Sequence, residues 1–410
     1  MRLFYFSITL LFIISCSPSF AQKKAVFIIL DGIPADVLES VETPTLDEIA
    51  KVGGYTRAYT GGIAKGYSET PTISAVGYNS LLTGVWANKH NVWGNGIKKP
   101  NYNYWNIFRI AKAEKPEITT AIFSTWLDNR TKLVGEGLDE AGNFKFDYSF
   151  DGFENDKVNF PHKPDRIFIF NIDEHVSKEA GRYLAEKGID LSWVYLEFTD
   201  DIGHKYGDGE HMVDAVQKAD KQVKRIWDAI KEREEKYGED WMILITTDHG
   251  REQRTGRGHG GQSERERTIW MVTNTKELNE SFQHMPSMVD IMPSVLAHME
   301  IEIPKEIKKE VDGISFVGPI LAKNLVAEVS GEKIVLTWKA FQKSGKAEFF
   351  VAQTNSFKEG GKDEYIKLGK VSLNKERCEF DLPNGDSKTL KVLMKVGDHY
   401  LNAWMGKFEE

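Results

Sequence analysis

Aspartate and histidine residues recur in four short motifs of this 410-residue chain. The residues concerned are Asp31, Asp200, His204, Asp248, His249 and His259. Carboxylates and imidazoles in these numbers are the ligands needed to hold two divalent cations side by side. Because hard oxygen and borderline nitrogen donors together suit zinc or manganese better than calcium, zinc is the expected metal and manganese the alternative. The motifs therefore predict a two-metal hydrolase.

The three acids each come just after a short apolar run. The runs and acids are residues 25–30 with Asp31, residues 193–198 with Asp200, and residues 241–246 with Asp248. Such runs are typical of buried parallel strands, and ligands collect at the carboxyl ends of strands in open α/β sheets. A lone aspartate in this position is more often a helix cap, but independent caps would not be expected to recur at three strand ends. We therefore expect the three acids to meet at one edge of a sheet.

Strand-like and helix-like patterns alternate from residue 24 to about residue 322. Helices are expected at residues 45–52, 104–113, 174–187 and 212–237, and strands at residues 121–123, 193–198, 242–246 and 269–272. This alternation predicts a mostly parallel central sheet covered by helices on both faces. Residues 24–322 are thus the expected catalytic domain.

The pattern changes after about residue 323. Short strands are expected at residues 334–338, 348–351, 365–368, 378–380 and 390–395, with turn residues such as Gly360 and Gly361 between them. Their number and spacing predict a small β-sandwich, like a fibronectin type III module, over residues 323–410. This accessory domain contains no ligand-like cluster. We expect it to pack against the enzyme, with carbohydrate or partner binding as the alternative.

The N-terminus has the pattern of a targeting segment. Arg2 precedes an apolar stretch over residues 3–14, which is too short to span a bilayer and suits a signal-peptide core. Cleavage after Ala21 by ordinary signal peptidase would remove residues 1–21. Alternatively, residues 13–16 resemble a bacterial lipobox, in which case the signal would end at residue 15 and Cys16 would be lipidated. The mature chain is expected to be exported, as a periplasmic protein, an outer-membrane lipoprotein or a secreted one.

Composition narrows the possible partners. The formal net charge of −8 argues against a nucleic-acid scaffold, and a small phosphate-ester substrate could still bind through the metals. Cys16 and Cys378 are the two cysteines of the chain, so no intrachain disulfide is expected after processing. The sequence leaves the oligomeric state open.

Ser74 is the candidate nucleophile. It stands at the expected start of an apolar helix, where its hydroxyl would be exposed beside free backbone N–H groups that favour developing negative charge. A simple serine N-cap is the alternative interpretation.

The sequence resembles the alkaline phosphatase superfamily, most closely its type I phosphodiesterase/nucleotide pyrophosphatase branch. The segments that carry the resemblance are Leu30-Asp31-Gly32, Thr43-Pro44-Thr45-Leu46, Ser80-Leu81-Leu82-Thr83-Gly84, Asp200-Asp201-Ile202-Gly203-His204-Lys205-Tyr206-Gly207, Thr247-Asp248-His249-Gly250 and Gly258-His259-Gly260-Gly261. Asp290-Ile291-Met292-Pro293-Ser294-Val295-Leu296 and Asp312-Gly313-Ile314-Ser315 resemble the family's C-terminal signature. The resemblance covers about residues 24–320 and implies an alkaline-phosphatase-like three-layer sandwich.

The resemblance also implies roles for individual residues. The nucleophile would be Ser74, and one metal would be held by Ser74, Asp31, Asp248 and His249. The other metal would be held by Asp200, His204 and His259. The reaction implied is hydrolysis of phosphate esters, most strongly phosphodiesters, through a phospho-serine intermediate.

Two departures from the family pattern keep alternatives open. The branch's asparagine three residues after the nucleophile is Gly77 here, and Asn79 or Asn95 could take its place. The short interval between His249 and His259 is more similar to phosphoethanolamine transferases than to nucleotide pyrophosphatases. Such a transferase, or a phosphonate or phosphomonoester hydrolase, is therefore the alternative, and a non-catalytic glycan-binding surface protein is a further one. A formylglycine sulfatase is disfavoured because its conversion motif is absent after Ser74.

Overall fold

The computed structural model describes residues 21–382 and 390–406 of the chain. Residues 1–20 of the predicted signal segment, with Cys16, lie outside the described residues. No helix within the described part of the chain is both long enough and apolar enough to cross a bilayer.

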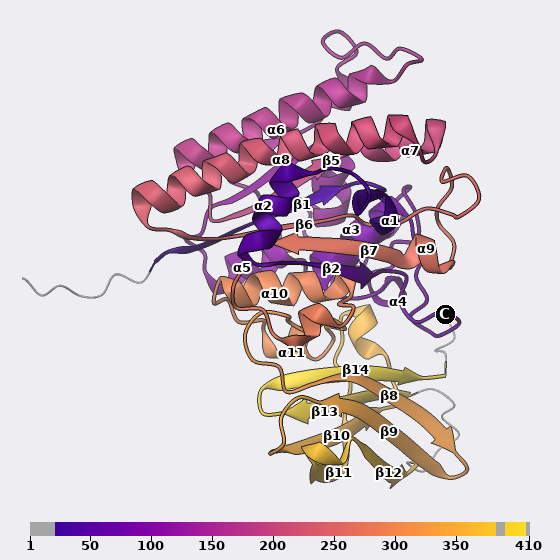
Figure 1. Ribbon diagram of the computed structural model, residues 1–410. Helices are drawn as coiled ribbons and strands as arrows, with labels where there is room; N and C mark the ends of the chain where they lie inside the picture. Colours follow the sequence, from indigo (N-terminus) through magenta and orange to yellow (C-terminus); the bar gives the residue numbers. More distant parts are fainter. Residues whose placement is uncertain (1–20, 383–389, 407–410) are drawn as a thin grey trace, which may run out of the picture.

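Seven strands form the central sheet, in the order β2-β7-β6-β1-β5-β3-β4 (Figure 1). In chain order they are β1 (Lys23–Leu30), β2 (Gly54–Tyr59), β3 (Thr120–Ser124), β4 (Tyr148–Phe150), β5 (Leu191–Leu196), β6 (Asp240–Thr246) and β7 (Thr268–Thr273). Strands β6, β1, β5, β3 and β4 are parallel to one another, and β7 and β2 add an antiparallel edge. The prediction of a mostly parallel sheet is confirmed.

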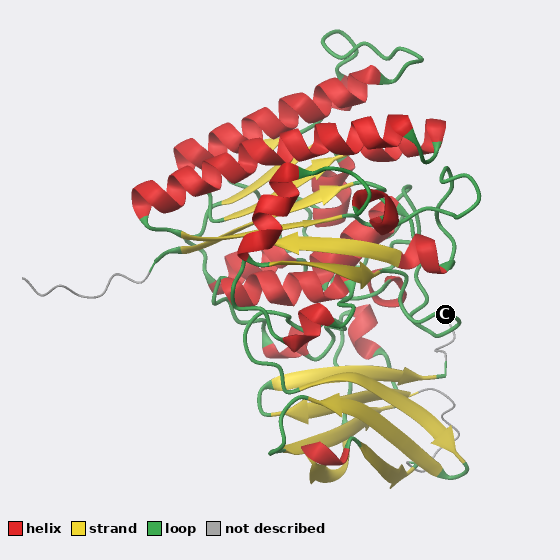
Figure 2. Ribbon diagram, in the orientation of Figure 1, coloured by secondary structure: helices red, strands yellow, loops and turns green. Residues whose placement is uncertain are grey.

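Helices cover both faces of this sheet (Figure 2). One face packs against α1 (Ala35–Leu38), α2 (Pro44–Val52), α6 (Ile167–Lys187) and α8 (Glu210–Tyr237), and the other against α3 (Ser74–Thr83), α5 (Ile107–Glu114) and α10 (Ile291–His298). The alternation along β1 requires cover on both faces, because Val26 and Ile28 pack into one core while Phe27 and Ile29 pack into the other. Shorter helices are α4 (Ala87–His90), α7 (Phe198–Tyr206), α9 (Glu264–Arg267) and α11 (Lys305–Lys308).

Some predicted boundaries were wrong, and capping contacts explain two of them. The strand predicted at residues 193–198 ends at Leu196, because the Asp173 carboxylate accepts the backbone N–H groups of Glu197 and Phe198 at the start of α7. The helix predicted from residue 104 begins at Ile107, after the side chain of Asn106 caps it. The helix predicted from residue 174 begins earlier, at Ile167.

Residues 322–382 and 390–405 form two antiparallel sheets packed as a sandwich. One sheet has the order β11-β10-β13-β14 and the other β12-β9-β8. The strands are β8 (Ala322–Ser330), β9 (Lys333–Ala340), β10 (Lys346–Ala352), β11 (Ile366–Ser372), β12 (Arg377–Asp381), β13 (Leu390–Val396) and β14 (His399–Met405). The predicted sandwich is confirmed, with β8 and β14 added to the strands expected from the sequence.

Buried charges join the sandwich to the α/β part. The Nζ of Lys89 in α4 donates to Asp312 Oδ1 at 2.6 Å and to Asn402 Oδ1 of β14 at 3.0 Å. The Nζ of Lys391 on β13 donates to both carboxylate oxygens of Glu310 and to Asp363. Buried ammonium groups require such partners, so the two parts meet in a specific arrangement.

Candidate active site

The predicted acids meet at the carboxyl edge of the sheet. Asp31 follows β1 directly, Asp248 follows β6, and Asp200 lies in the first turn of α7, the helix that leaves β5. Since β6, β1 and β5 are adjacent and parallel, their carboxyl ends lie side by side. Asp31 and Asp248 are 1% exposed, so the cluster is built into the protein rather than on its surface.

Asp31, Asp248 and His249 form the first half of the cluster. The Nε2 of His249 lies 3.6 Å from Asp31 Oδ1 and 3.2 Å from Asp248 Oδ2. The other oxygen of each carboxylate is already used: Asp31 Oδ2 accepts the Tyr195 hydroxyl at 2.7 Å, and Asp248 Oδ1 accepts the N–H of Gly32 at 3.1 Å. Among the described residues, Asp31 Oδ1 and Asp248 Oδ2 have no hydrogen-bond partner although both are buried.

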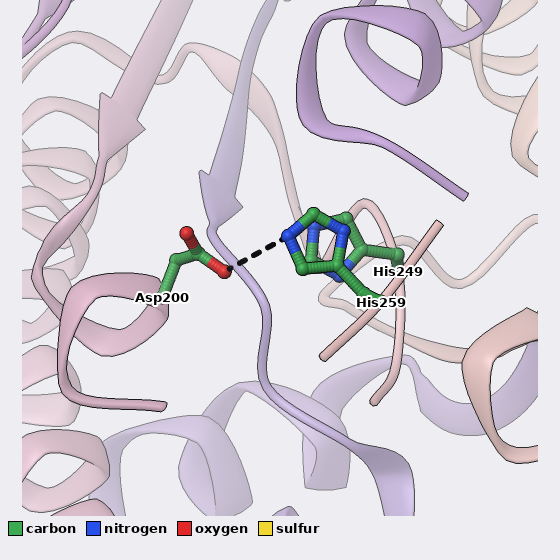
Figure 3. Close-up of side chains that lie close together, drawn as sticks. All are labelled: Asp200, His249 and His259. Atoms are coloured by element: carbon green, nitrogen blue, oxygen red, sulfur yellow. Dashed lines mark ion pairs between the residues drawn. The ribbon is translucent and has the colours of Figure 1, made fainter. Parts of the chain in front are cut away.

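Asp200, His204 and His259 form the second half. The Nε2 of His204 lies 3.2 Å from Asp200 Oδ2 and 3.1 Å from His259 Nε2. Figure 3 shows the rings of His249 and His259 stacked, with Asp200 facing them. The Nε2 of His259 lies 3.9 Å from Asp200 Oδ1. Donor atoms of Asp200, His249 and His259 all lie within 4.8 Å of one another, so His249 borders both halves.

The histidine tautomers suit metal binding. The Nδ1 atoms of His249 and His259 lie 2.9 Å from the carbonyl oxygens of Gly250 and Thr72. A carbonyl only accepts, so each Nδ1 carries the proton and each Nε2 presents a lone pair to the cluster. Backbone partners of this kind orient the imidazoles of metal sites.

The cluster brings three carboxyl groups together in a buried site, and this shifts the pKa values of its residues. Burial, reinforced by the charges of Asp248 and Asp200, raises the pKa of Asp31 well above its ordinary value. Burial likewise raises the pKa of Asp248 to about 7, and it lowers the pKa of His249. Burial also opposes ionisation of Asp200, but the hydrogen bond from His204 and the charge of Arg251 keep its pKa below the ordinary value. Unpartnered buried oxygens and converging lone pairs together fit two divalent cations.

Ser74 lies beside the first half of the cluster. Its Oγ is 3.5 Å from His249 Nε2, at the first residue of α3. Ser74 is buried rather than exposed as expected, because the loop carrying His259 lies against the segment before α3. The alternative of a simple cap is wrong: the residue at the N-cap is Ile73, and α3 has no side-chain cap.

The structure distinguishes the candidates for the missing asparagine. Asn95 Oδ1 accepts the N–H of Ala75 at 3.0 Å, which brings its amide next to Ser74. Asn79 lies a turn further along α3 and is buried. At Gly77 a Cβ would lie 3.1 Å from the backbone oxygen of Asp248, so a side chain there would require a shift of a few tenths of an ångström.

Three residues that contact the cluster were not predicted from the sequence. The hydroxyls of Tyr78 and Tyr195 both donate to Asp31, and the buried Arg251 pairs with Asp200. Tyr78 lies four residues after Ser74, on the same face of the helix, which was a signal available in the sequence. Tyr195 and Arg251 gave no such signal, because apolar strands and polar loops commonly contain these residue types.

Curated proteins with similar sequences match somewhat more than half of this chain. The chain is 24% identical over 238 residues to ectonucleotide pyrophosphatase/phosphodiesterase family member 7 of Rattus norvegicus, covering 56% of this chain and 50% of that protein. It is also 24% identical over 246 residues to human family member 5, covering 57% of this chain and 46% of that protein. The chain thus spans about half the length of the curated relatives it matches.

A solved structure shares the fold. The alkaline phosphatase superfamily protein from Vibrio parahaemolyticus superimposes with a TM-score of 0.50 at 14% identity, covering 90% of this chain and 84% of that one. The family model for type I phosphodiesterase / nucleotide pyrophosphatase matches residues 25–259, more than half of the chain and all of the clustered acids and histidines. The chain therefore belongs to the type I phosphodiesterase / nucleotide pyrophosphatase family.

Proposed function

We propose that this protein is an exported two-metal hydrolase that cleaves phosphate esters, preferably phosphodiesters, through a phospho-serine formed on Ser74. One observation carries the proposal. The Ser74 Oγ lies 3.5 Å from His249 Nε2, in a cluster where two buried carboxylate oxygens lack a partner among the described residues. A nucleophile beside such a cluster is the arrangement that two-metal phosphoryl transfer requires.

The residues present would supply two cation sites. Asp31, Asp248, His249 and Ser74 would hold one cation, and Asp200, His204 and His259 the other. The donor set favours zinc, with manganese as the alternative. When bound, the two cations supply positive charge that lowers the pKa of the Ser74 hydroxyl and offsets the charge that develops on the phosphate oxygens.

The chain's own groups arrange the reaction. Ser74 gives up its hydroxyl proton to solvent as Oγ attacks phosphorus, and the bond to the leaving oxygen breaks as that oxygen takes up a proton. Water then attacks the phosphoryl-serine, its oxygen stays on phosphorus in the released product, and a proton returns to Ser74 Oγ. The phosphate lies at the N-terminus of α3, where free N–H groups favour negative charge. Asn95 is fixed there by the N–H of Ala75, and its amide NH₂ can donate to a phosphate oxygen.

The preference for a diester rests on the family and on the charges near Ser74. Relatives are named as nucleotide pyrophosphatases/phosphodiesterases. Arg251, the buried arginine of the cluster, is engaged by Asp200 and by backbone carbonyls, so it is not available to clamp a dianionic monoester. The alternative is a phosphoethanolamine transferase, or a phosphonate or phosphomonoester hydrolase, on the same scaffold.

The location and attachment of the protein are part of the same proposal. The N-terminal pattern supports export to the periplasm, attachment to the outer membrane through a lipidated Cys16, or secretion. Mass spectrometry of the purified N-terminus tests the attachment, because a lipidated Cys16 and a chain beginning at Gln22 differ in mass.

Three chromogenic substrates test the reaction class. The zinc-loaded protein should hydrolyse bis-p-nitrophenyl phosphate with a higher kcat/KM than p-nitrophenyl phosphate, and p-nitrophenyl sulfate least. A higher kcat/KM for the monoester would favour the phosphomonoesterase alternative. No turnover of any substrate, with both cations bound, would favour a non-catalytic binding protein.

A further inference from the structure

Arg251 is a fully buried arginine at the metal cluster, two residues after His249. Its guanidinium forms an ion pair with Asp200 Oδ1. Its Nε donates to the carbonyl of Gly32 at 2.9 Å, Nη1 to the carbonyl of Arg257 at 3.1 Å, and Nη2 to the carbonyl of Asp200 at 2.8 Å. One planar group therefore contacts three separate stretches of chain.

Each of these stretches carries a proposed metal ligand. Gly32 is the neighbour of Asp31, Asp200 is itself a ligand, and Arg257 lies two residues before His259. Arg251 thus cross-links the end of β1, the helix α7 and the loop between His249 and His259. A guanidinium suits this task because its five donors have a fixed planar geometry that a lysine ammonium cannot reproduce.

Two glycines make room for the guanidinium. A Cβ at Gly203 would lie 2.2 Å from Arg251 Cζ, and a Cβ at Gly32 would lie 2.8 Å from Nη2. Gly203 is inside α7, where alanine is the better helix former and the backbone does not require glycine. The space taken by Arg251 accounts for glycine at this position.

The contacts also orient Asp200. Arg251 engages Oδ1 while His204 Nε2 lies 3.2 Å from Oδ2, so the carboxylate is fixed in one rotamer with an oxygen toward the two histidines. We propose that Arg251 is a positioning residue that holds Asp200, His204 and His259 in the arrangement their cation needs. Cation binding by these three residues then depends on the planar guanidinium of Arg251. This inference rests on the proposed two-metal function.

Substitutions of Arg251 and Gly203 test the proposal by metal binding. Arg251→Lys keeps the charge but loses the planar guanidinium, and Arg251→Met loses both. Gly203→Ala displaces the guanidinium without removing any charged group. Arg254→Met, at an exposed arginine of the same loop, is the matched control. Each apo protein is titrated with Zn²⁺ by calorimetry, and bound zinc is counted by elemental analysis after dialysis.

Wild-type protein and Arg254→Met should bind two ions per chain. The three test variants should bind one ion normally and the second about 10- to 100-fold more weakly, the range found when partners of metal ligands are removed. Their activity should return at higher Zn²⁺ with kcat little changed, which a general loss of structure would not produce. In the Arg251→Met background, Gly203→Ala should cause no further loss, because the alanine then has room.

The outcomes separate this proposal from the function on which it rests. Wild-type affinity for both ions in Arg251→Met and Gly203→Ala would overturn the role of Arg251 and leave the two-metal function standing. Tighter binding in Arg251→Met would also overturn it, because the charge of Arg251 would then outweigh its positioning. A wild-type protein that binds fewer than two ions would overturn the proposed function and this inference with it.

Discussion

The hydroxyl oxygen of Ser74 lies 3.5 Å from the Nε2 of His249, although the two residues are 175 positions apart in the sequence. The contact exists because the first turn of α3 rests on the end of β6, where Gly77 allows the helix to approach the Asp248 backbone. A nucleophile on one element and the metal ligands on another are thereby held in a fixed relationship by the packing of the core.

His259→Ala should remove one cation of two. The imidazole Nε2 lies near Asp200 and His204, so its loss leaves that half with too few donors, whereas Asp31, Asp248 and His249 remain. Elemental analysis of protein dialysed against low zinc measures the stoichiometry. His284→Ala, at an exposed histidine, is the control; equal zinc content in both variants would exclude His259 as a ligand.

Asn95→Ala should lower kcat by about 10²- to 10³-fold, the usual cost of removing one donor that stabilises transition-state charge. Asn95→Asp keeps an acceptor for the Ala75 N–H but replaces the amide donors by negative charge, so it should be at least as damaging. Steady-state kinetics on bis-p-nitrophenyl phosphate measure both. An unchanged kcat in the aspartate variant would show that Asn95 does not face the phosphate.

Much of the site was predictable because its positions follow from strand ends. Asp31 and Asp248 were placed by the apolar runs before them, and His204 shares a helix face with Asp200 at i and i+4. The sequence could not choose between Asn79 and Asn95, because only the fold brings the loop containing Asn95 to the start of α3. Arg251 was missed for a similar reason, since its partners Gly32 and Asp200 lie in segments that are distant in the sequence.

The fold was predicted less well at its edges than at its centre. Strands β1, β5 and β6 are continuous apolar runs because both faces are buried. Strand β2 has the mixed sequence Gly54–Tyr59 and pairs with β7 at the edge of the sheet, so its pattern was too polar to stand out.

His90 should make the protein sensitive to acid. Burial lowers the pKa of His90 to about 3, from the ordinary value near 6.5 in the unfolded chain. Between these values the unfolded state binds more protons, so the free energy of unfolding falls as pH falls from about 6.5 to 3, by on the order of 4 kcal/mol. His90→Asn keeps an acceptor for the Val92 N–H and should flatten this dependence in urea denaturation. Parallel stability curves for the two proteins would contradict the assignment.

Lys391→Met should destabilise the protein strongly, because it leaves Glu310 and Asp363 buried without their cation. Removing one partner of a buried ion pair typically costs about 3–5 kcal/mol. Urea denaturation measures the loss, with Lys367→Met as the control, since the Lys367–Glu348 pair lies at the surface. A loss no larger than that of the control would mean that these charges contribute little to docking of the β-sandwich.

Rapid-quench mass spectrometry can detect the phospho-serine that covalent catalysis by Ser74 requires. Wild-type protein mixed with bis-p-nitrophenyl phosphate and quenched in acid should carry a p-nitrophenyl phosphoryl group on the peptide containing Ser74. Ser74→Ala should carry none and should lose turnover while retaining its zinc. Turnover in Ser74→Ala close to that of the wild type, or a phosphoryl group on a different residue, would contradict the account.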